Sequence, residues 1–108
     1  MINYVEVKKV DGSDKIMTTQ IVSDYLDEKM EIDEEYIVCT FFDLRVKHNI
    51  QEKDVQKFLE LAKIKLENLD YKVYFTGAEF LFKGDRKRVK ENEYMIAIKD
   101  NDKVKVKY

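Results

Sequence analysis

Three side chains that could perform acid–base or phosphate chemistry lie close together near the middle of the sequence. Asp43 and Arg45 are two residues apart in a predicted strand, so their side chains would share one face. His48 is the only histidine and follows in the next turn. These three residues are therefore candidates for a catalytic site. No known catalytic spacing supports that interpretation, and an ion pair on a solvated strand face with a loop histidine nearby is favoured over it.

A basic segment near the end of the chain is the second candidate. Residues 83–90 hold five basic residues and one acid, and lysines alternate along residues 103–107. Nucleic-acid-binding proteins combine such cations with aromatic platforms for bases. The alternative is a solvated hairpin whose lysines keep an edge strand from pairing with other chains. The nucleic-acid-binding candidates are Lys83, Arg86, Lys87, Arg88, Lys90, Lys103, Lys105 and Lys107. The aromatic residues interleaved nearby (Tyr74, Phe75, Phe80 and Phe82) are expected to belong to the core.

An acidic segment, residues 24–35, is the third candidate, with seven acids and one lysine. Its spacing is not that of an EF-hand loop and no glycine marks the required turn, so we predict no metal site. A carboxylate-covered surface can occupy the nucleic-acid groove of a partner protein, or it can be an ordinary solvated helix end and loop. The partner-binding candidates are Asp27, Glu28, Glu31, Asp33, Glu34 and Glu35, together with Leu61 and Ile64 on a second helix.

The chain has few cysteines and few glycines, the residues on which several cofactor and catalytic motifs depend. The single cysteine, Cys39, lies in an apolar run and is expected to be a buried, inert thiol. Three glycines are too few for a phosphate-binding loop or a dinucleotide fingerprint. We therefore predict no cofactor and no enzymatic activity.

The elements that must position these residues follow from hydrophobic spacing. Residues 2–10 predict a strand and residues 11–14 a turn. A short helix over about 18–28 would be capped by Thr18 or Thr19. The most apolar run, 36–42, predicts a central strand that continues to residue 47.

The clearest predicted element is a helix over about 50–69. Asn49 would cap it, with Glu52 as the returning acid of a capping box. An apolar stripe is predicted to face the core, formed by Val55, Phe58, Leu59, Ala62, Leu66 and Leu69. Leu61 and Ile64 lie off that stripe and indicate either a second contact surface or packing under a terminal segment.

The remaining chain predicts strands only. Residues 71–76 and 80–82 would form a hairpin through the turn at 76–79, and Gly84–Asp85 would break the chain. Residues 93–99 and 103–108 would form another hairpin through a loop at 100–102. This order favours an α+β fold: a mostly antiparallel sheet of about five strands with the long helix on one face. Residues 36–76 could form a split βαβ unit, as in ferredoxin-like folds.

Length and composition set the remaining expectations. A chain of 108 residues is expected to be one domain over 1–108, and no apolar stretch is long enough to span a membrane. The first ten residues do not resemble a signal peptide, so the cytoplasm is the default compartment. The net charge is −6 over residues 1–70 and +4 over 71–108, an asymmetry that can orient partners or favour homo-oligomers.

The leading functional hypothesis is a small non-catalytic accessory or regulatory protein that binds a larger protein partner. The chain has no proline and only three glycines, and lysine, isoleucine and asparagine are abundant. This composition suggests an AT-rich genome, such as that of a low-GC bacterium or of a phage or mobile element within it. The alternative hypothesis is a small nucleic-acid-binding domain that uses residues 83–90 and the C-terminal lysines.

Overall fold

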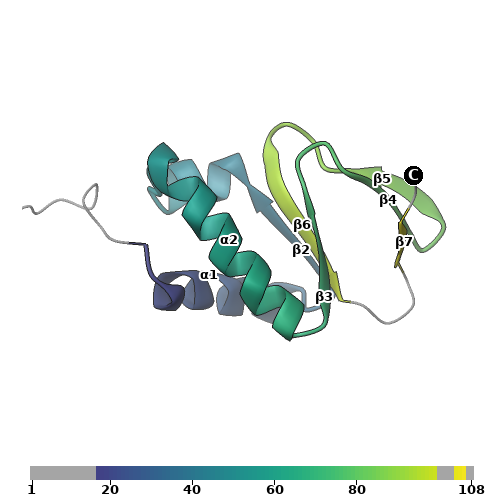
Figure 1. Ribbon diagram of the computed structural model, residues 1–108, viewed down its shortest axis with the longest axis horizontal. Coiled ribbons are helices and arrows are strands. Elements are labelled where there is room, and N and C mark those ends of the chain that lie inside the picture. The colour runs from purple at the N-terminus through teal and green to yellow at the C-terminus, as the bar shows by residue number, and fades with distance from the viewer. Residues whose placement is uncertain (1–16, 100–103, 107–108) are drawn as a thin grey trace, which may run out of the picture.

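The computed structural model describes residues 17–99 and the backbone of residues 104–106, and it is an α+β fold, as predicted. Helices cover one face of a three-stranded sheet, and a second three-stranded sheet covers the other (Figure 1). The elements are α1 (Thr19–Ile32), β2 (Tyr36–Thr40), the π-helix η2 (Phe42–Lys47), α2 (Glu52–Asn68), β3 (Tyr71–Phe75), β4 (Glu79–Phe82), β5 (Asp85–Arg88), β6 (Glu93–Lys99) and β7 (Val104–Val106). The predicted strand 2–10 and turn 11–14 lie outside the described residues.

Helix α1 confirms the predicted short helix and extends it. Thr18 is the N-cap, and its side-chain oxygen accepts a hydrogen bond of 3.3 Å from the backbone N–H of Ile21. Val22 and Leu26 are buried against the sheet and α2. The helix continues past residue 28 to Ile32, because Met30 still packs against this core.

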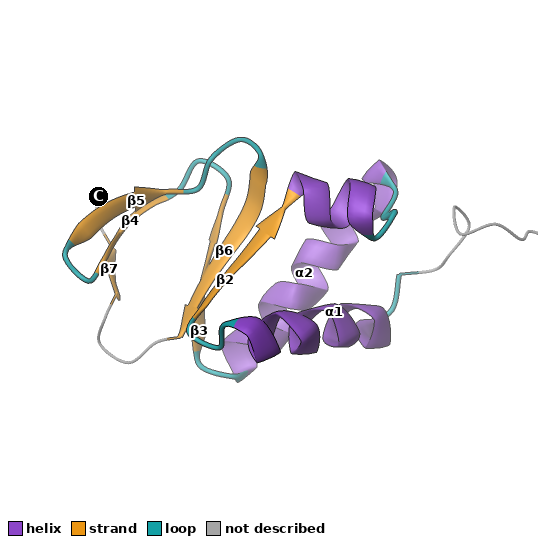
Figure 2. Ribbon diagram, turned by 180° about the vertical axis from the view of Figure 1, so that it is seen from behind, coloured by secondary structure: helices purple, strands orange, loops and turns teal. Residues whose placement is uncertain are grey.

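The predicted long strand 36–47 is wrong in its second half. The strand ends at Thr40, and the chain turns into the π-helix η2, which is visible at the end of β2 in Figure 2. The backbone N–H of His48 closes this turn by donating to the carbonyl of Asp43 at 3.0 Å. The turn buries Leu44 completely and leaves Val46 exposed, although the two residues alternate with polar neighbours as they would in a strand.

Helix α2 confirms the predicted amphipathic helix, whose buried residues are Val55, Phe58, Ala62 and Leu66. Two details of the prediction are wrong. Asn49 does not cap the helix, since it has a positive φ of 54° and the N-cap is Gln51, which makes no side-chain capping bond. Leu69 does not join the buried stripe, because the helix ends at Asn68 and Leu69 is exposed.

The first sheet has the strand order β2-β6-β3. Both outer strands are antiparallel to β6, so β2 and β3 are parallel to each other and are joined through α2. This is the predicted split βαβ unit, whereas the wider ferredoxin-like arrangement stays a prediction. The central strand is β6 rather than the apolar run 36–42, which lies at an edge among the described strands.

The alternation along β6 divides the interior into two cores. Met95 and Ala97 pack into the core beneath the helices, while Ile96 and Ile98 pack into a second core toward the other sheet. That second core also holds Phe80, whose ring stacks on Tyr74 at a centroid distance of 4.3 Å. Both faces of β6 are therefore covered, which explains its nearly continuous burial.

The second sheet has the strand order β5-β4-β7, and it overturns both predicted hairpins. Strand β3 does not return on β4, because β3 pairs with β6 and β4 pairs with β5 and β7. Nor does β7 return on β6, since it joins β4; the loop 100–102 itself lies outside the described residues. Strand β5 was not predicted, because its sequence Asp-Arg-Lys-Arg has no apolar residue. No helix in the described part of the chain could cross a membrane.

Candidate functional site

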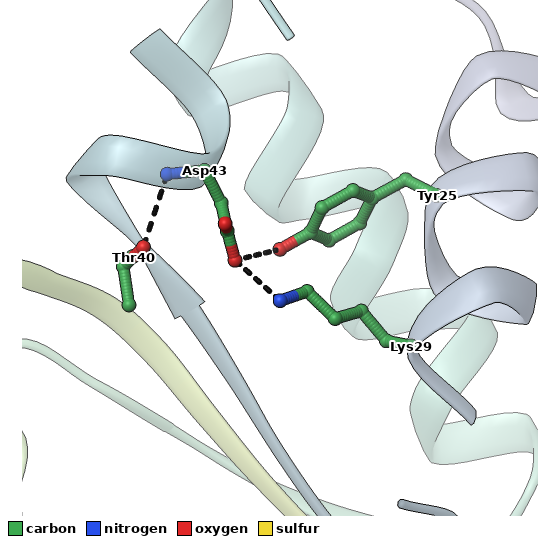
Figure 3. Close-up of polar contacts among 4 residues, drawn as sticks. All are labelled: Tyr25, Lys29, Thr40 and Asp43. Atoms are coloured by element: carbon green, nitrogen blue, oxygen red, sulfur yellow. Dashed lines mark hydrogen bonds and ion pairs between the residues drawn. The ribbon is translucent and has the colours of Figure 1, made fainter. Parts of the chain in front are cut away.

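Asp43 joins η2 to α1 through polar contacts (Figure 3). Its carboxylate forms an ion pair with Lys29 and accepts a hydrogen bond of 3.3 Å from the Tyr25 hydroxyl. Its backbone N–H donates to the Thr40 hydroxyl oxygen at 3.0 Å. Only 13% of the Asp43 side chain is exposed. The carboxylate thus holds the π-helix against α1.

The other two members of the predicted catalytic group point elsewhere. The Arg45 guanidinium lies 3.5 Å from the Glu52 carboxylate and covers the ring of Phe41. His48 packs edge-on against Tyr25, with ring centroids 5.2 Å apart. Apart from the backbone hydrogen bond between His48 and Asp43, no hydrogen bond, ion pair or ring contact joins Asp43, Arg45 and His48 to one another, because η2 replaces the strand that would have aligned the first two. The geometry therefore offers no support for acid–base catalysis by these residues.

Cys39 lies in the core on β2 and is completely buried. Burial raises the pKa of its thiol to about 12, which suppresses the nucleophilic thiolate. We expect Ellman's reagent at pH 8 to leave Cys39 unmodified in the folded protein and to titrate one thiol after unfolding in urea. Rapid modification without urea would show that β2 opens readily and would contradict this burial.

The basic segment is divided between paired and unpaired cations. Lys83 lies 3.0 Å from Glu35, and Arg88 lies 3.8 Å from Glu79. Within the part of the chain that the structure describes, three cations of this segment form no ion pair: Arg86, Lys87 and Lys90. Lys105 is described only by its backbone, opposite Leu81, and Lys103 and Lys107 lie outside the described residues.

The aromatic residues near this segment form no exposed platform beside the cations. Lys83 lies over the ring of Phe82, with its Nζ 5.1 Å from the ring centroid, but that ring is buried. Phe80 and Phe82 are buried in the second core, as expected, and Tyr74 is stacked on Phe80. Phe75 packs partly against the other core, on the helix side of the first sheet. Base stacking at these cations therefore has no support among the described residues.

The acidic segment divides into a helix face and a turn. Asp24, Asp27, Glu28 and Glu31 follow one another at i, i+3, i+4 and i+7 along α1, and all four are exposed. We call these four residues the acidic face. Asp27 pairs with Lys65 at 2.9 Å, and the other three form no ion pair with the described residues.

The three residues that follow α1 take part in local structure, Asp33 and Glu35 through their carboxylates and Glu34 through its backbone carbonyl. The carboxylate of Asp33 accepts hydrogen bonds of 3.0 and 3.3 Å from the backbone N–H groups of Glu35 and Tyr36. Glu35 pairs with Lys83, and the carbonyl of Glu34 accepts a hydrogen bond from the Tyr71 hydroxyl. These contacts hold the turn between α1 and β2. The partner-binding candidates Asp33, Glu34 and Glu35 are thus separate from the acidic face.

A pocket of about 290 Å³ opens beside the acidic face. Asp24 and Glu28 lie one helical turn apart at this pocket, and His48 comes from the loop after η2. The remaining lining residues are Ile21, Tyr25, Ile50 and Phe58. No group of three or more potential ligands among the described residues could hold a metal ion. Sequence reasoning missed this pocket because its residues come from three separate segments; the i, i+4 spacing of Asp24 and Glu28 was the one available signal.

Comparison with known proteins finds no match. Neither a protein-family model, nor a curated protein, nor a solved structure is similar to this chain. The arrangement of its own side chains is therefore the basis for any functional proposal.

Leu61 and Ile64 lie at a second cavity, of about 360 Å³, between α1 and α2. Ile64 is exposed and Leu61 is half-buried against the helix core. Val22 and Leu69 also line this cavity. Both residues therefore border a cavity between the two helices, and whether a partner covers it stays a prediction.

Proposed function

We propose that this chain is a small, non-catalytic accessory or regulatory protein that binds a larger protein partner through the acidic face of α1. The observation that carries the proposal is the alignment of four exposed carboxylates on one helix stripe, three of them unpaired among the described residues. Charge of one sign concentrated on one face attracts a complementary surface and orients it. The partner surface is therefore basic.

The energetics of α1 support this proposal. Like charges at i, i+4 occur twice on this face, between Asp24 and Glu28 and between Asp27 and Glu31, and each such pair costs an exposed helix about 0.2–0.5 kcal/mol. Glu31 also lies in the last turn, where negative charge opposes the helix dipole. A cationic partner would remove both costs. Ile32 is 79% exposed at the end of the same helix and adds an apolar contact for that partner.

The variant that tests this proposal reverses three charges of the acidic face at once: Asp24→Lys, Glu28→Lys and Glu31→Lys. We expect the affinity for a deca-lysine peptide, measured by fluorescence anisotropy, to fall by at least about tenfold, since roughly 1.4 kcal/mol corresponds to one factor of ten. A pull-down from the native host after nuclease treatment should lose the same partner that the unchanged protein recovers.

The matched control reverses the charge of three exposed acids outside the acidic face: Glu60→Lys, Glu67→Lys and Glu91→Lys. It changes the net charge equally and leaves α1 intact. We expect it to keep the partner and most of the peptide affinity. Equal loss in both variants would mean that net charge alone attracts the peptide, and the acidic face would then not be the site.

A second candidate function is nucleic-acid binding at the second sheet. The observation in its favour is that Arg86, Lys87 and Lys90 have no acidic partner among the described residues. In that case, affinity for a single-stranded oligonucleotide should fall steeply with salt, and Arg86→Ala with Arg88→Ala should weaken it. If nuclease treatment abolishes recovery of the partner in the pull-down, this function is favoured over the first.

A further inference from the structure

The pocket beside the acidic face combines an apolar interior with charge at its rim. Ile21, Ile50 and the ring of Phe58 contribute apolar surface, and Asp24 and Glu28 contribute two carboxylates. Burying a carboxylate against a purely apolar ligand is unfavourable, and an anionic ligand would be repelled. A fitting ligand therefore has an apolar stem and a cationic end, which describes a lysine or arginine side chain.

Among the described residues, Lys29 of α1 and Lys65 of α2 are engaged elsewhere. Lys29, the only lysine of α1, reaches across to Asp43 (Figure 3). Lys65 of α2 pairs with Asp27, which does not line the pocket. Neither Asp24 nor Glu28 forms an ion pair with a described residue, although Asp24 accepts a hydrogen bond from Gln20. No cation among the described residues therefore neutralises this rim, and a cation from another molecule can do so.

We infer that this pocket binds one lysine or arginine side chain from the basic surface of the protein partner, an inference that rests on the proposed function. The stem lies along Ile21 and Ile50, and the cationic end lies between the carboxylates of Asp24 and Glu28. A guanidinium has several planar donors and can pair with both carboxylates, whereas an ammonium acts as a point charge. Arginine should therefore bind more tightly than lysine.

His48 provides a direct readout, because it lines the pocket and is the only histidine in the chain. The probe is a short glycine–serine peptide that contains one arginine. Its control contains citrulline, a neutral side chain of nearly the same shape. We expect the arginine peptide to shift the His48 imidazole resonances in a saturable way and the citrulline peptide to leave them in place. Equal shifts with both peptides, or none with arginine, would overturn the inference.

A pocket-filling variant separates this inference from the proposed function. Ile21→Phe narrows the pocket without changing charge, and Gln56→Phe adds the same aromatic ring at an exposed site of α2 that does not line the pocket. We expect Ile21→Phe to abolish the arginine-induced shift and Gln56→Phe to retain it, while both variants still bind deca-lysine. If Ile21→Phe folds and keeps the shift, the side chain binds elsewhere. Loss of deca-lysine binding on charge reversal would still support the acidic face.

Discussion

Replacing Phe80 by alanine is expected to destabilise the protein by about 3–5 kcal/mol, as for other fully buried phenylalanines. Phe80 is completely buried between the two sheets and stacks on Tyr74. Its removal takes away apolar surface burial, leaves a cavity and ends the ring contact. Because the second core contains few residues, its neighbours have little capacity to fill the space. Urea unfolding followed by circular dichroism measures the loss.

The control for this experiment is Phe42→Ala. Phe42 is 61% exposed on η2, so the same deletion there should cost less than about 1 kcal/mol. Hydrogen exchange shows where in the fold the destabilisation occurs. In Phe80→Ala the backbone amides of β4 and β5 should lose protection before those of α2 do. Equal costs at the two positions would contradict the packing of the second sheet onto the first.

Replacing Asp43 by alanine is expected to cost about 2–3 kcal/mol. The change leaves the Lys29 ammonium, which is only 25% exposed, without its carboxylate. It also removes one acceptor of the buried Tyr25 hydroxyl, which is neutral at pH 7 and whose pKa is raised further by burial. An unpaired cation and the loss of this hydrogen bond both favour opening of the contact between η2 and α1. The measurement is again the free energy of unfolding in urea.

Glu52→Ala is the matched control, because it breaks the other ion pair of η2. Glu52 is 85% exposed, so loss of its pair with Arg45 should change stability by less than about 0.5 kcal/mol. Combining Asp43→Ala with Lys29→Met should recover part of the loss, since no unpaired charge then remains. A cost near zero for Asp43→Ala would show that the ion pair adds nothing to the attachment of η2.

Regular hydrophobic spacing allowed α1, α2 and β6 to be predicted from the sequence. Each buries a face that its own spacing defines, as with Phe58 and Leu66 on α2, so local sequence and tertiary packing agree. The prediction failed where one pattern suits two structures. Alternation at Leu44 and Val46 is compatible with a strand, yet burial of Leu44 is achieved in a π-helix.

The charged residues of the candidate surfaces could also be identified from the sequence, but the ion pairs that they form could not. The spacing along residues 24–31 placed acids on one helix, and the basic residues of 83–90 were evident as a cluster. Which charges are neutralised depended on partners far away in sequence, such as Lys65 for Asp27 and Lys83 for Glu35. Long-range pairing of this kind leaves no periodic signal in a single chain.

The sequence by itself determined the elements with a regular apolar stripe, the α+β class and the kinds of charge available on the surface. Only the tertiary structure decided that β6 lies between two cores, that β4 leaves β3 for a second sheet, and that His48 meets Asp24 and Glu28 at one pocket. The physical reason is that periodicity reports which face of an element avoids water. It does not report which other element covers that face, because many apolar partners satisfy the same requirement.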